Sequence, residues 1–237
     1  AVSNARMTDP VRQATENRIW RRIVPKHGRV LDQACGKGSF SRRLASQVSK
    51  DVKIFGLDIA ENILTAAAKE DGGISYILGD AERLPFPNDS LDVILCITSV
   101  EVIENPDPLI VESNRVLKSG GHLYLCLHKP FLDPLILPTA ARLVYRLWRR
   151  LAGKCEEHSR IGYPGSLGEW RAHLRRRLSA AGFRAIEAGA LLCQMEWGLY
   201  RIICPAAGRY LLRVCPLLNR LPVSYYKSLE YWLLRKP

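Results

Sequence analysis

Val30-Leu31-Asp32-Gln33-Ala34-Cys35-Gly36-Lys37-Gly38 is an apolar run that ends in an acidic residue and continues into a turn of small residues. The segment that follows, residues 39–45, is amphipathic, so the pattern predicts a strand, a tight loop and a helix. Glycine has no Cβ, and the backbone can therefore turn sharply at Gly36 and Gly38 and approach a ligand closely. The N-terminus of the predicted helix offers free N–H groups to a polar or negative ligand.

Further apolar runs follow this loop and end in carboxylates. Residues 52–58 end in Asp58, and residues 74–80 end in Asp80. In a nucleotide-binding unit, a carboxylate about 20 residues after the glycine loop accepts hydrogen bonds from ribose hydroxyls, and Asp58 has this spacing. Two more apolar runs, 91–97 and 121–127, alternate with helical stretches. This pattern is typical of a parallel sheet covered on both faces, which binds ligands at the carboxyl ends of its strands.

Four segments in this order resemble class I S-adenosylmethionine-dependent methyltransferases, in the group that includes quinone-biosynthesis enzymes. They are VLDQACGKG, GLDIAENIL, GDAERLPFPNDSLDVILCITSVEVIENP and RVLKSGGHLYL, and they cover about residues 28–129. EHSRIGYPGSLGEWRAHLRRRLSAAGF resembles the family's segment before its sixth strand, and YWLLRKP resembles its seventh strand. The resemblance implies a single α/β domain, with a Rossmann-like, seven-stranded, mostly parallel sheet and helices on both faces.

The resemblance also implies S-adenosylmethionine as the cofactor and assigns a role to each matching residue. Five residues would form the loop around the methionine part: Asp32, Ala34, Cys35, Gly36 and Gly38. Asp58 would hold the ribose hydroxyls, and Ile59 would lie against the adenine. Asp80 would accept a hydrogen bond from the adenine amino group, with the backbone of Ala81 beside it. Ile97, at the end of the fourth strand, would face the methionine moiety.

Two other interpretations of the loop remain. A dinucleotide-dependent dehydrogenase uses a similar turn, but the sequence has no G-x-G-x-x-G, and residues 79–86 match the adenine-binding stretch of methyltransferases. In the other interpretation, the carboxylates only cap helices of an α/β domain that binds no cofactor.

Methyl transfer needs few catalytic groups, because it mainly requires the acceptor to be held about 3 Å from an already activated methyl carbon. A general base helps when the acceptor loses a proton. The family often places a His near the end of the fourth strand, but here Glu101 is followed by Val102 at that position. His158 and His128 are the candidate substitutes, although either could be an ordinary loop histidine. Glu101 could instead accept hydrogen bonds from the cofactor's amino group.

The positive charge lies in the second half of the chain. Residues 1–129 hold 17 basic and 16 acidic residues, whereas residues 130–237 hold 18 and 7. That half contains two apolar, arginine-bearing segments, 130–157 and 195–227, which we expect to be helical cap insertions after the fifth strand and between the sixth and seventh. They favour a lid over a hydrophobic acceptor, or peripheral contact with an anionic membrane. Nucleic acid fits less well, because these segments are dominated by Leu, Ile and Val. A merely solvated basic face also remains open.

Composition predicts a cytoplasmic enzyme, with possible peripheral contact with a membrane. No apolar run reaches the roughly 18 residues of a membrane span, and the first nine residues contain no signal-peptide core. The seven cysteines lack metal-ligand spacing, so no metal is expected. In the N-terminal segment 1–27, residues 10–23 predict a helix whose Ile19, Trp20 and Ile23 either close over the cofactor or dock on the sheet.

The expected function is methyl transfer to a small or medium hydrophobic acceptor, at oxygen or carbon. Two alternatives are a membrane-associated lipid or RNA methyltransferase and a non-catalytic protein that binds S-adenosylmethionine. The sequence leaves the oligomeric state open.

Overall fold

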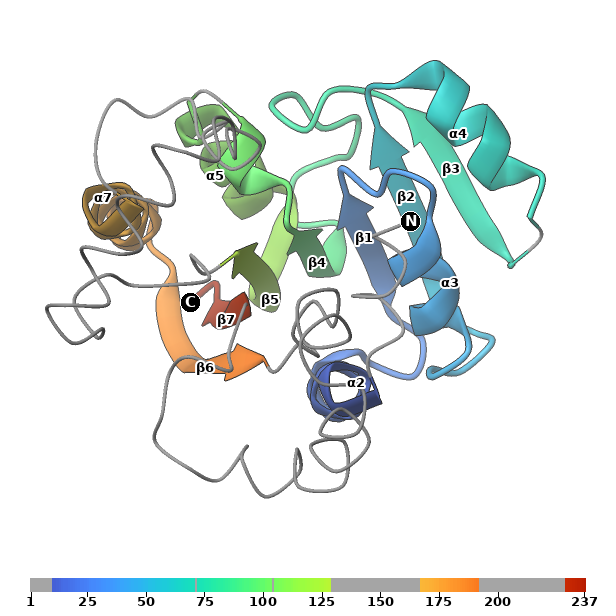
Figure 1. The fold of residues 1–237 in the computed structure, drawn as a ribbon, viewed down its shortest axis with the longest axis horizontal. Coiled ribbons are helices and arrows are strands. Elements are labelled where there is room, and N and C mark those ends of the chain that lie inside the picture. The colour runs from blue at the N-terminus through green and yellow to red at the C-terminus, as the bar shows by residue number, and fades with distance from the viewer. Residues whose placement is uncertain (1–9, 71, 104, 129–166, 192–228) are drawn as a thin grey trace, which may run out of the picture.

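A seven-stranded sheet forms the centre of the computed structural model, which describes residues 10–70, 72–103, 105–128, 167–191 and 229–237 (Figure 1). The strand order is β3-β2-β1-β4-β5-β7-β6. The strands are β1 (Arg29–Gln33), β2 (Lys53–Asp58), β3 (Ile74–Leu78), β4 (Leu91–Ile97), β5 (Leu117–His128), β6 (Arg184–Leu191) and β7 (Leu229–Arg235). β7 runs antiparallel to both of its neighbours, and the other pairs are parallel. The predicted seven-stranded, mostly parallel sheet is therefore confirmed.

The chain order reverses at β1, which pairs in parallel with both β2 and β4. From β1 the chain proceeds outward to β3, returns to β4 on the other side of β1, and continues to β5. Such a reversal leaves a crevice at the carboxyl ends of the two central strands, where open α/β sheets bind their ligands. The topology therefore places the loop after β1 where a ligand site is expected.

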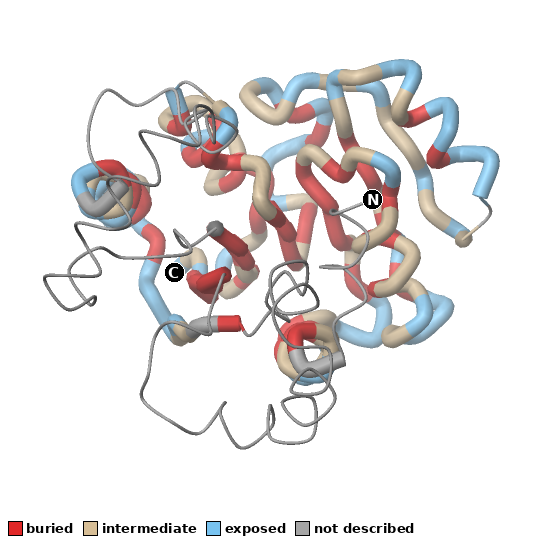
Figure 2. The backbone as a smooth tube through the Cα atoms, viewed as in Figure 1, coloured by how far each residue is buried: buried red, intermediate tan, exposed pale blue. Residues whose placement is uncertain are grey.

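Helices cover both faces of the sheet. They are α2 (Pro10–Ile23), α3 (Ser39–Ala45), α4 (Glu61–Ala68), the 3₁₀ turn η1 (Val100–Val102), α5 (Asp107–Val116) and α7 (Leu167–Ala180). One apolar core lies between the sheet and α5 with α7, and the second lies between the sheet and α2 with α3. Figure 2 shows the buried residues concentrated along the central strands. Since both faces are covered, β4 is apolar along nearly its whole length.

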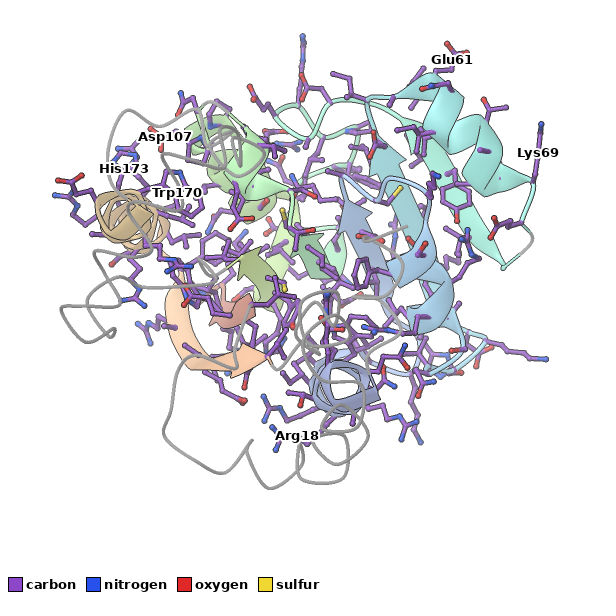
Figure 3. The ribbon with its side chains drawn as sticks, in the orientation of Figure 1. Arg18, Glu61, Lys69, Asp107, Trp170 and His173 are labelled. Atoms are coloured by element: carbon purple, nitrogen blue, oxygen red, sulfur yellow. The ribbon has the colours of Figure 1, made fainter. Side chains whose placement is uncertain are left out.

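Polar contacts join α5 and α7, the two helices that cover the first core. Arg177 Nε donates to Asp107 Oδ1 at 2.6 Å, and His173 Nε2 lies 4.0 Å from the same oxygen. In Figure 3, Asp107 and His173 lie close together at the junction of the two helices. Trp170, one turn before His173, is 1% exposed and packs in the first core. These contacts fix α7 beside α5.

α2 is docked on the opposite face by its apolar residues. Ile19 and Trp20 are fully buried and Ile23 is nearly so, within the second core. The ring of Trp20 meets that of Tyr124 edge to face, with 6.4 Å between the centroids. The sequence left open whether these three side chains close over the cofactor or dock on the sheet. The structure shows them docked on the sheet.

A buried ion cluster joins α2 to α3. Glu16 is fully buried and accepts hydrogen bonds from Arg12 Nε at 3.0 Å and from Arg43 Nη2. The guanidinium carbon of Arg43 also lies 4.4 Å from the centroid of the Trp20 ring. A buried carboxylate is tolerated when it is paired in this way, so this cluster orients α2 against α3.

The predicted cap insertions, 130–157 and 195–227, lie outside the described residues. None of the helices in the described ranges combines the length and apolar character that a membrane span requires.

Candidate functional site

The loop between β1 and α3 is held in an unusual backbone conformation. Ala34, Gly36 and Gly38 all have positive φ, at 58°, 54° and 68°. Cys35 N donates to Leu57 O at 2.9 Å, and Gly38 N donates to Cys35 O at 3.0 Å. Glycine adopts such φ values without the steric cost that a Cβ brings. The loop is therefore a tight turn, anchored to the neighbouring strand β2.

The two glycines face different surroundings. A Cβ built on Gly36 would meet no atom within 4 Å, so the space beside this residue is open to a ligand. A Cβ on Gly38 would lie 2.0 Å from Tyr76 Oη, and one on Gly56 would lie 2.9 Å from Tyr76 Cδ1. Gly36 therefore leaves a cradle for a ligand, whereas Gly38 and Gly56 make room for the ring of Tyr76.

Tyr76 was not predicted from the sequence as part of the site. It lies on β3, in register with Gly56 of β2. Arg42 Nη1 lies 3.4 Å from the Tyr76 hydroxyl and donates to Lys37 O at 2.9 Å. Arg42 of α3 and Tyr76 of β3 thus both contact the loop, Arg42 through Lys37 O and Tyr76 through its ring against Gly38. The only sequence signal was an aromatic residue at the centre of a strand whose partner position is a glycine.

Asp58 connects the end of β2 to the loop. Its Oδ2 accepts a hydrogen bond from Gly36 N at 2.7 Å, and its Oδ1 accepts one from Ala60 N at 3.0 Å. A carboxylate can accept about four hydrogen bonds, so acceptor capacity remains for ribose hydroxyls. Ile59 follows directly, with 72% of its surface exposed. An exposed apolar side chain therefore stands beside a carboxylate that has acceptor capacity to spare.

Asp32 lies beneath the loop and is only 1% exposed. Its Oδ2 accepts a hydrogen bond from Ser41 Oγ at 2.5 Å, which ties β1 to α3. Burial raises the pKa of Asp32 to about 7, although the hydrogen bonds from Ser41 partly oppose this shift. Asp32 therefore holds together β1 and α3, the two elements that flank the loop.

Cys35 contributes mainly its backbone to the loop. Its side chain is 7% exposed, and its Sγ would lie 3.0 Å from a Cβ on Gly56, on the side of the sheet that Tyr76 occupies. Burial raises the pKa of the Cys35 thiol well above its usual range. The thiol is therefore neutral and unsuited to nucleophilic chemistry.

Gln33 is a further residue that the sequence interpretation missed. It is fully buried, its Nε2 donates to Ala81 O at 2.8 Å, and its Oε1 accepts from Ser113 Oγ at 3.1 Å. A buried amide needs partners, and a lone Gln at the end of an apolar strand was the available signal. Gln33 joins β1 to the segment after β3 and to α5.

The segment after β3 carries the predicted adenine-side residues. Gly79 N donates to Asp58 O at 3.0 Å, so this segment stays close to the end of β2. Asp80 is exposed, and its Oδ1 accepts from Glu82 N at 2.8 Å. The backbone of Ala81 is held by Gln33. Asp80 and Ala81 therefore lie at the same edge of the sheet as Asp58.

An ion pair on α5 fixes the continuation of this segment. Arg115 Nη2 donates to Leu84 O at 3.0 Å, and Glu112 Oε2 accepts from Leu84 N at 2.8 Å. Arg115 and Glu112 also bond each other at 2.7 Å through two atom pairs. The Arg115 guanidinium holds the pKa of Glu112 below its ordinary value. The Leu-Pro-Phe stretch is thus clamped from α5.

The end of β4 meets the same loop. Ile97 is 5% exposed, and Thr98, with φ 57°, donates its N–H to Cys126 O at 2.8 Å. Ser99 Oγ donates to Ala34 O at 3.3 Å. These contacts bring the end of β4 to the loop at Ala34, and the Ile97 side chain packs in the second core. The role of Ile97 beside the methionine moiety stays a prediction.

The candidate catalytic residues are placed less completely. Glu101, in η1, is 5% exposed and lies within electrostatic reach of Arg171 of α7, whereas Val102 is 65% exposed. His128 is the last residue of β5, at the carboxyl edge of the sheet, in register with Leu229; its side chain lies outside what the structure describes. His158 lies outside the described residues.

The described residues were also compared with the ligand groups that bind metal ions. Within the part of the chain that the structure describes, no three His, Cys, Asp or Glu side chains are grouped to hold a metal ion.

Comparison with known proteins finds similarity to methyltransferases. Residues 31–125 match the model of a methyltransferase domain. The ubiquinone/menaquinone biosynthesis C-methyltransferase UbiE of Pasteurella multocida is 30% identical over 132 residues, which cover 50% of this chain and 49% of that protein. The chain thus spans about half the length of the curated relatives it matches.

Solved structures share the fold. An S-adenosylmethionine-dependent methyltransferase from Mesorhizobium loti has a TM-score of 0.57 at 19% identity, with 92% of this chain and 96% of that chain covered. Phosphoethanolamine N-methyltransferase 2 of Haemonchus contortus, in complex with S-adenosyl-L-methionine, has a TM-score of 0.56 at 18% identity, covering 94% and 52%. The match of residues 31–125 to a methyltransferase domain favours the methyltransferase interpretation over the dehydrogenase interpretation, and the solved structures show that the fold is shared.

Proposed function

We propose that this chain transfers the methyl group of S-adenosylmethionine to a small or medium hydrophobic acceptor. The observation that carries the cofactor part is the Asp58 carboxylate, bonded to Gly36 N at 2.7 Å beside an open cradle and the exposed Ile59. When bound, the cofactor supplies a methyl group already activated on a sulfonium. The residues of the chain have to bind, orient and enclose the reactants.

Each cofactor residue has a proposed task that its surroundings support. The backbone of the loop from Ala34 to Gly38 would hold the methionine part. Asp58 would accept hydrogen bonds from the ribose hydroxyls through its remaining lone pairs, and Ile59 would cover one face of the adenine. Asp80 would accept from the adenine amino group. Asp32 and Gln33 would keep the loop and the adenine-side segment in place.

For the acceptor, we propose a carbon atom of a hydrophobic, quinol-like ring, with oxygen as the second choice. Support comes from the name of the Pasteurella relative, a C-methyltransferase of quinone biosynthesis. Support also comes from the apolar composition of residues 130–157 and 195–227. The enclosure of such an acceptor would exclude water from the reacting atoms.

Proton removal from the acceptor falls, in this proposal, to Glu101, His158 or His128. Glu101 is the described candidate, and it sits on η1, directly after the strand whose end meets the cofactor loop. The variants Glu101→Gln, His158→Ala and His128→Ala, measured one by one, separate these roles. The base is the residue whose replacement lowers turnover and removes the corresponding limb of the pH–rate profile, while cofactor affinity is retained.

We also propose that the enzyme works in the cytoplasm and takes its acceptor from an anionic membrane surface. Arginines are spaced along the apolar segments 130–157 and 195–227, which suits headgroup contact with apolar insertion. Flotation with anionic vesicles tests this step, because an enzyme with only a closed lid would stay in the bottom fraction.

Calorimetry with S-adenosylmethionine tests the core of the proposal. We expect saturable binding of one cofactor per chain, and a folded sample without binding at up to about 1 mM cofactor would overturn it. Transfer of a labelled methyl group into an extract of membrane quinols tests the acceptor. Label in phospholipid or RNA instead would favour the alternative methyltransferases, and cofactor binding without any transfer would favour the non-catalytic alternative.

A further inference from the structure

Glu16 of α2 is a fully buried carboxylate that the proposed methyl transfer does not use. It accepts a hydrogen bond from Arg12 Nε, one turn earlier on the same helix, at 3.0 Å. It also accepts one from Arg43 Nη2 of α3, 27 residues away in the chain. An ionised side chain is costly to bury unless its partners are in place. The docking of α2 therefore requires that α3 presents Arg43 at this position.

Both guanidinium groups of this cluster lie over the ring of Phe40. The guanidinium carbon of Arg12 lies 4.9 Å from the ring centroid, and that of Arg43 lies 5.3 Å from it. Such contacts are attractive, because the face of an aromatic ring carries negative partial charge. Phe40 is the second residue of α3, which begins directly after Gly38 at the end of the loop between β1 and α3. The cluster therefore holds the first turn of the helix into which this loop continues.

α3 also connects the cluster to the carboxylate of Asp32. Ser41, next to Phe40, donates to Asp32 Oδ2 at 2.5 Å. Burial raises the pKa of Asp32, and the charge of Arg43 is one of the weaker influences that lower it. Arg43 therefore lies within electrostatic reach of Asp32 while it bonds Glu16. A shift of α3 would disturb both contacts, so the position of α2 and the anchoring of the loop depend on the same helix.

Arg12 extends the cluster to the carboxyl ends of the central strands. Its Nη2 lies 3.9 Å from Cys126 Sγ. Cys126 stands in register with Ile97, and its carbonyl accepts from Thr98 N at 2.8 Å. The turn after β4 in turn contacts the loop between β1 and α3. The cluster thus joins α2 to elements on both sides of that loop.

We propose that Glu16 is a positioning residue of the S-adenosylmethionine site, which couples the docking of α2 to the placement of the loop between β1 and α3. The inference rests on the proposed function, which assigns this ligand to the loop. Glu16 acts through Arg43 and Arg12 rather than by contact with the cofactor. Coupling is reciprocal, so cofactor binding stabilises the docked α2 as much as the docked α2 favours the cofactor. An ion cluster without this role would stabilise the fold and leave cofactor affinity unchanged.

Calorimetry on the full chain, with S-adenosylmethionine as the probe, gives the first test. Glu16→Gln keeps the size of the side chain but removes the charge that holds Arg43. We expect its cofactor affinity to fall roughly tenfold. Leu178→Ala is the control, because Leu178 is buried in the first core, on the opposite face of the sheet, and its truncation lowers stability without touching the cluster. The control should bind the cofactor like the wild-type chain, and circular dichroism checks that both variants are folded.

Arg43→Gln tests whether Glu16 acts through α3. It should weaken cofactor binding about as much as Glu16→Gln does, since either substitution breaks the same contact. If the two residues act as one unit, the double variant should lose clearly less affinity than the two single losses together. Additive losses would mean that Glu16 and Arg43 influence the cofactor independently, which contradicts the proposal.

Hydrogen exchange tests the reciprocal effect in the wild-type chain, without any substitution. Saturating cofactor should slow exchange of the backbone amides of α2. The slowing should be lost in Glu16→Gln and retained in Leu178→Ala, whereas direct contact between α2 and the cofactor would preserve it in both. Unchanged exchange in α2 of the wild-type chain would overturn the proposal, even if Glu16→Gln did not fold.

The outcomes separate this inference from the proposed function. A folded wild-type chain that binds no S-adenosylmethionine overturns both. Wild-type binding with equal affinity in Glu16→Gln, or an equal loss in Leu178→Ala, overturns only the positioning role. A loss confined to the variants of the cluster, together with slowed exchange in α2, supports it.

Discussion

Gly36 donates its backbone N–H to Asp58 Oδ2 at 2.7 Å, so the glycine loop and the second strand are joined at the point where a cofactor would lie. One carboxylate thus has two tasks in our proposal: it holds the loop, and it accepts from the ribose. The open space beside Gly36 lies next to this bond.

Replacement of Asp58 by Ala should weaken binding of S-adenosylmethionine by about 1–3 kcal/mol, since hydrogen bonds to a charged group are lost. Calorimetry measures the change. Asp51→Ala is the matched control, because Asp51 is an exposed carboxylate that precedes β2 and lies away from the carboxyl edge. Equal affinity in the two variants would remove Asp58 from the site.

Gly36→Ala and Gly38→Ala should fail in different ways. At Gly38, an added Cβ meets the ring of Tyr76 as well as an unfavourable φ, so we expect a loss of stability above the roughly 1–2 kcal/mol of backbone strain alone. At Gly36, stability should fall only by the backbone strain, because the added Cβ meets no other atom. That Cβ would occupy the open space beside Gly36 and should weaken cofactor binding. Urea unfolding and calorimetry on both variants separate the two effects. Equal destabilisation by both substitutions would contradict the role of Tyr76.

Stability should fall as the pH rises from about 4 to 7 because of Asp32. Its pKa is raised from 3.8 to about 7 in the folded state, so the folded protein binds more protons than the unfolded chain between these values. The slope of stability with pH is then negative across that window, and the full penalty, of order 4 kcal/mol, is present above pH 7.

Asp32→Asn supplies the comparison for this pH dependence, because Asn can still accept from Ser41 but does not titrate. Denaturant unfolding at pH 5 and pH 8 should show a larger decline for the wild-type protein than for the variant. Parallel declines would show that Asp32 is ionised in the fold at pH 5.

Gln33→Leu should lower stability by about 1–3 kcal/mol, since the Ala81 carbonyl and the Ser113 hydroxyl lose a buried partner. Cofactor affinity should fall too, because the segment at Ala81 loses its anchor. A double-mutant cycle with Ser113→Ala tests whether the two side chains are coupled. The double variant should lose less stability than the two single variants together. Strict additivity would mean that the two side chains act independently.

The positions of the strands along the chain and of the carboxylates at their ends were predictable from the sequence. Asp32, Asp58 and Asp80 each follow an apolar run, and the carboxyl ends of parallel strands share one edge. The identity of the N-terminal helix was predictable from its apolar spacing, but its docked position was not. That position depends on contacts such as that between Trp20 and Tyr124, which are about a hundred residues apart in the chain.

Local chemistry alone therefore determined the glycine loop, the strands and the edge at which the carboxylates lie, because small residues, apolar runs and chain spacing act over short distances. Only tertiary structure decided that Tyr76 lies against Gly38, that Gln33 links Ala81 to Ser113, and that Arg235 stands between His122 and Arg184. Each of these depends on strand register and order, which bring together residues that no sequence period relates.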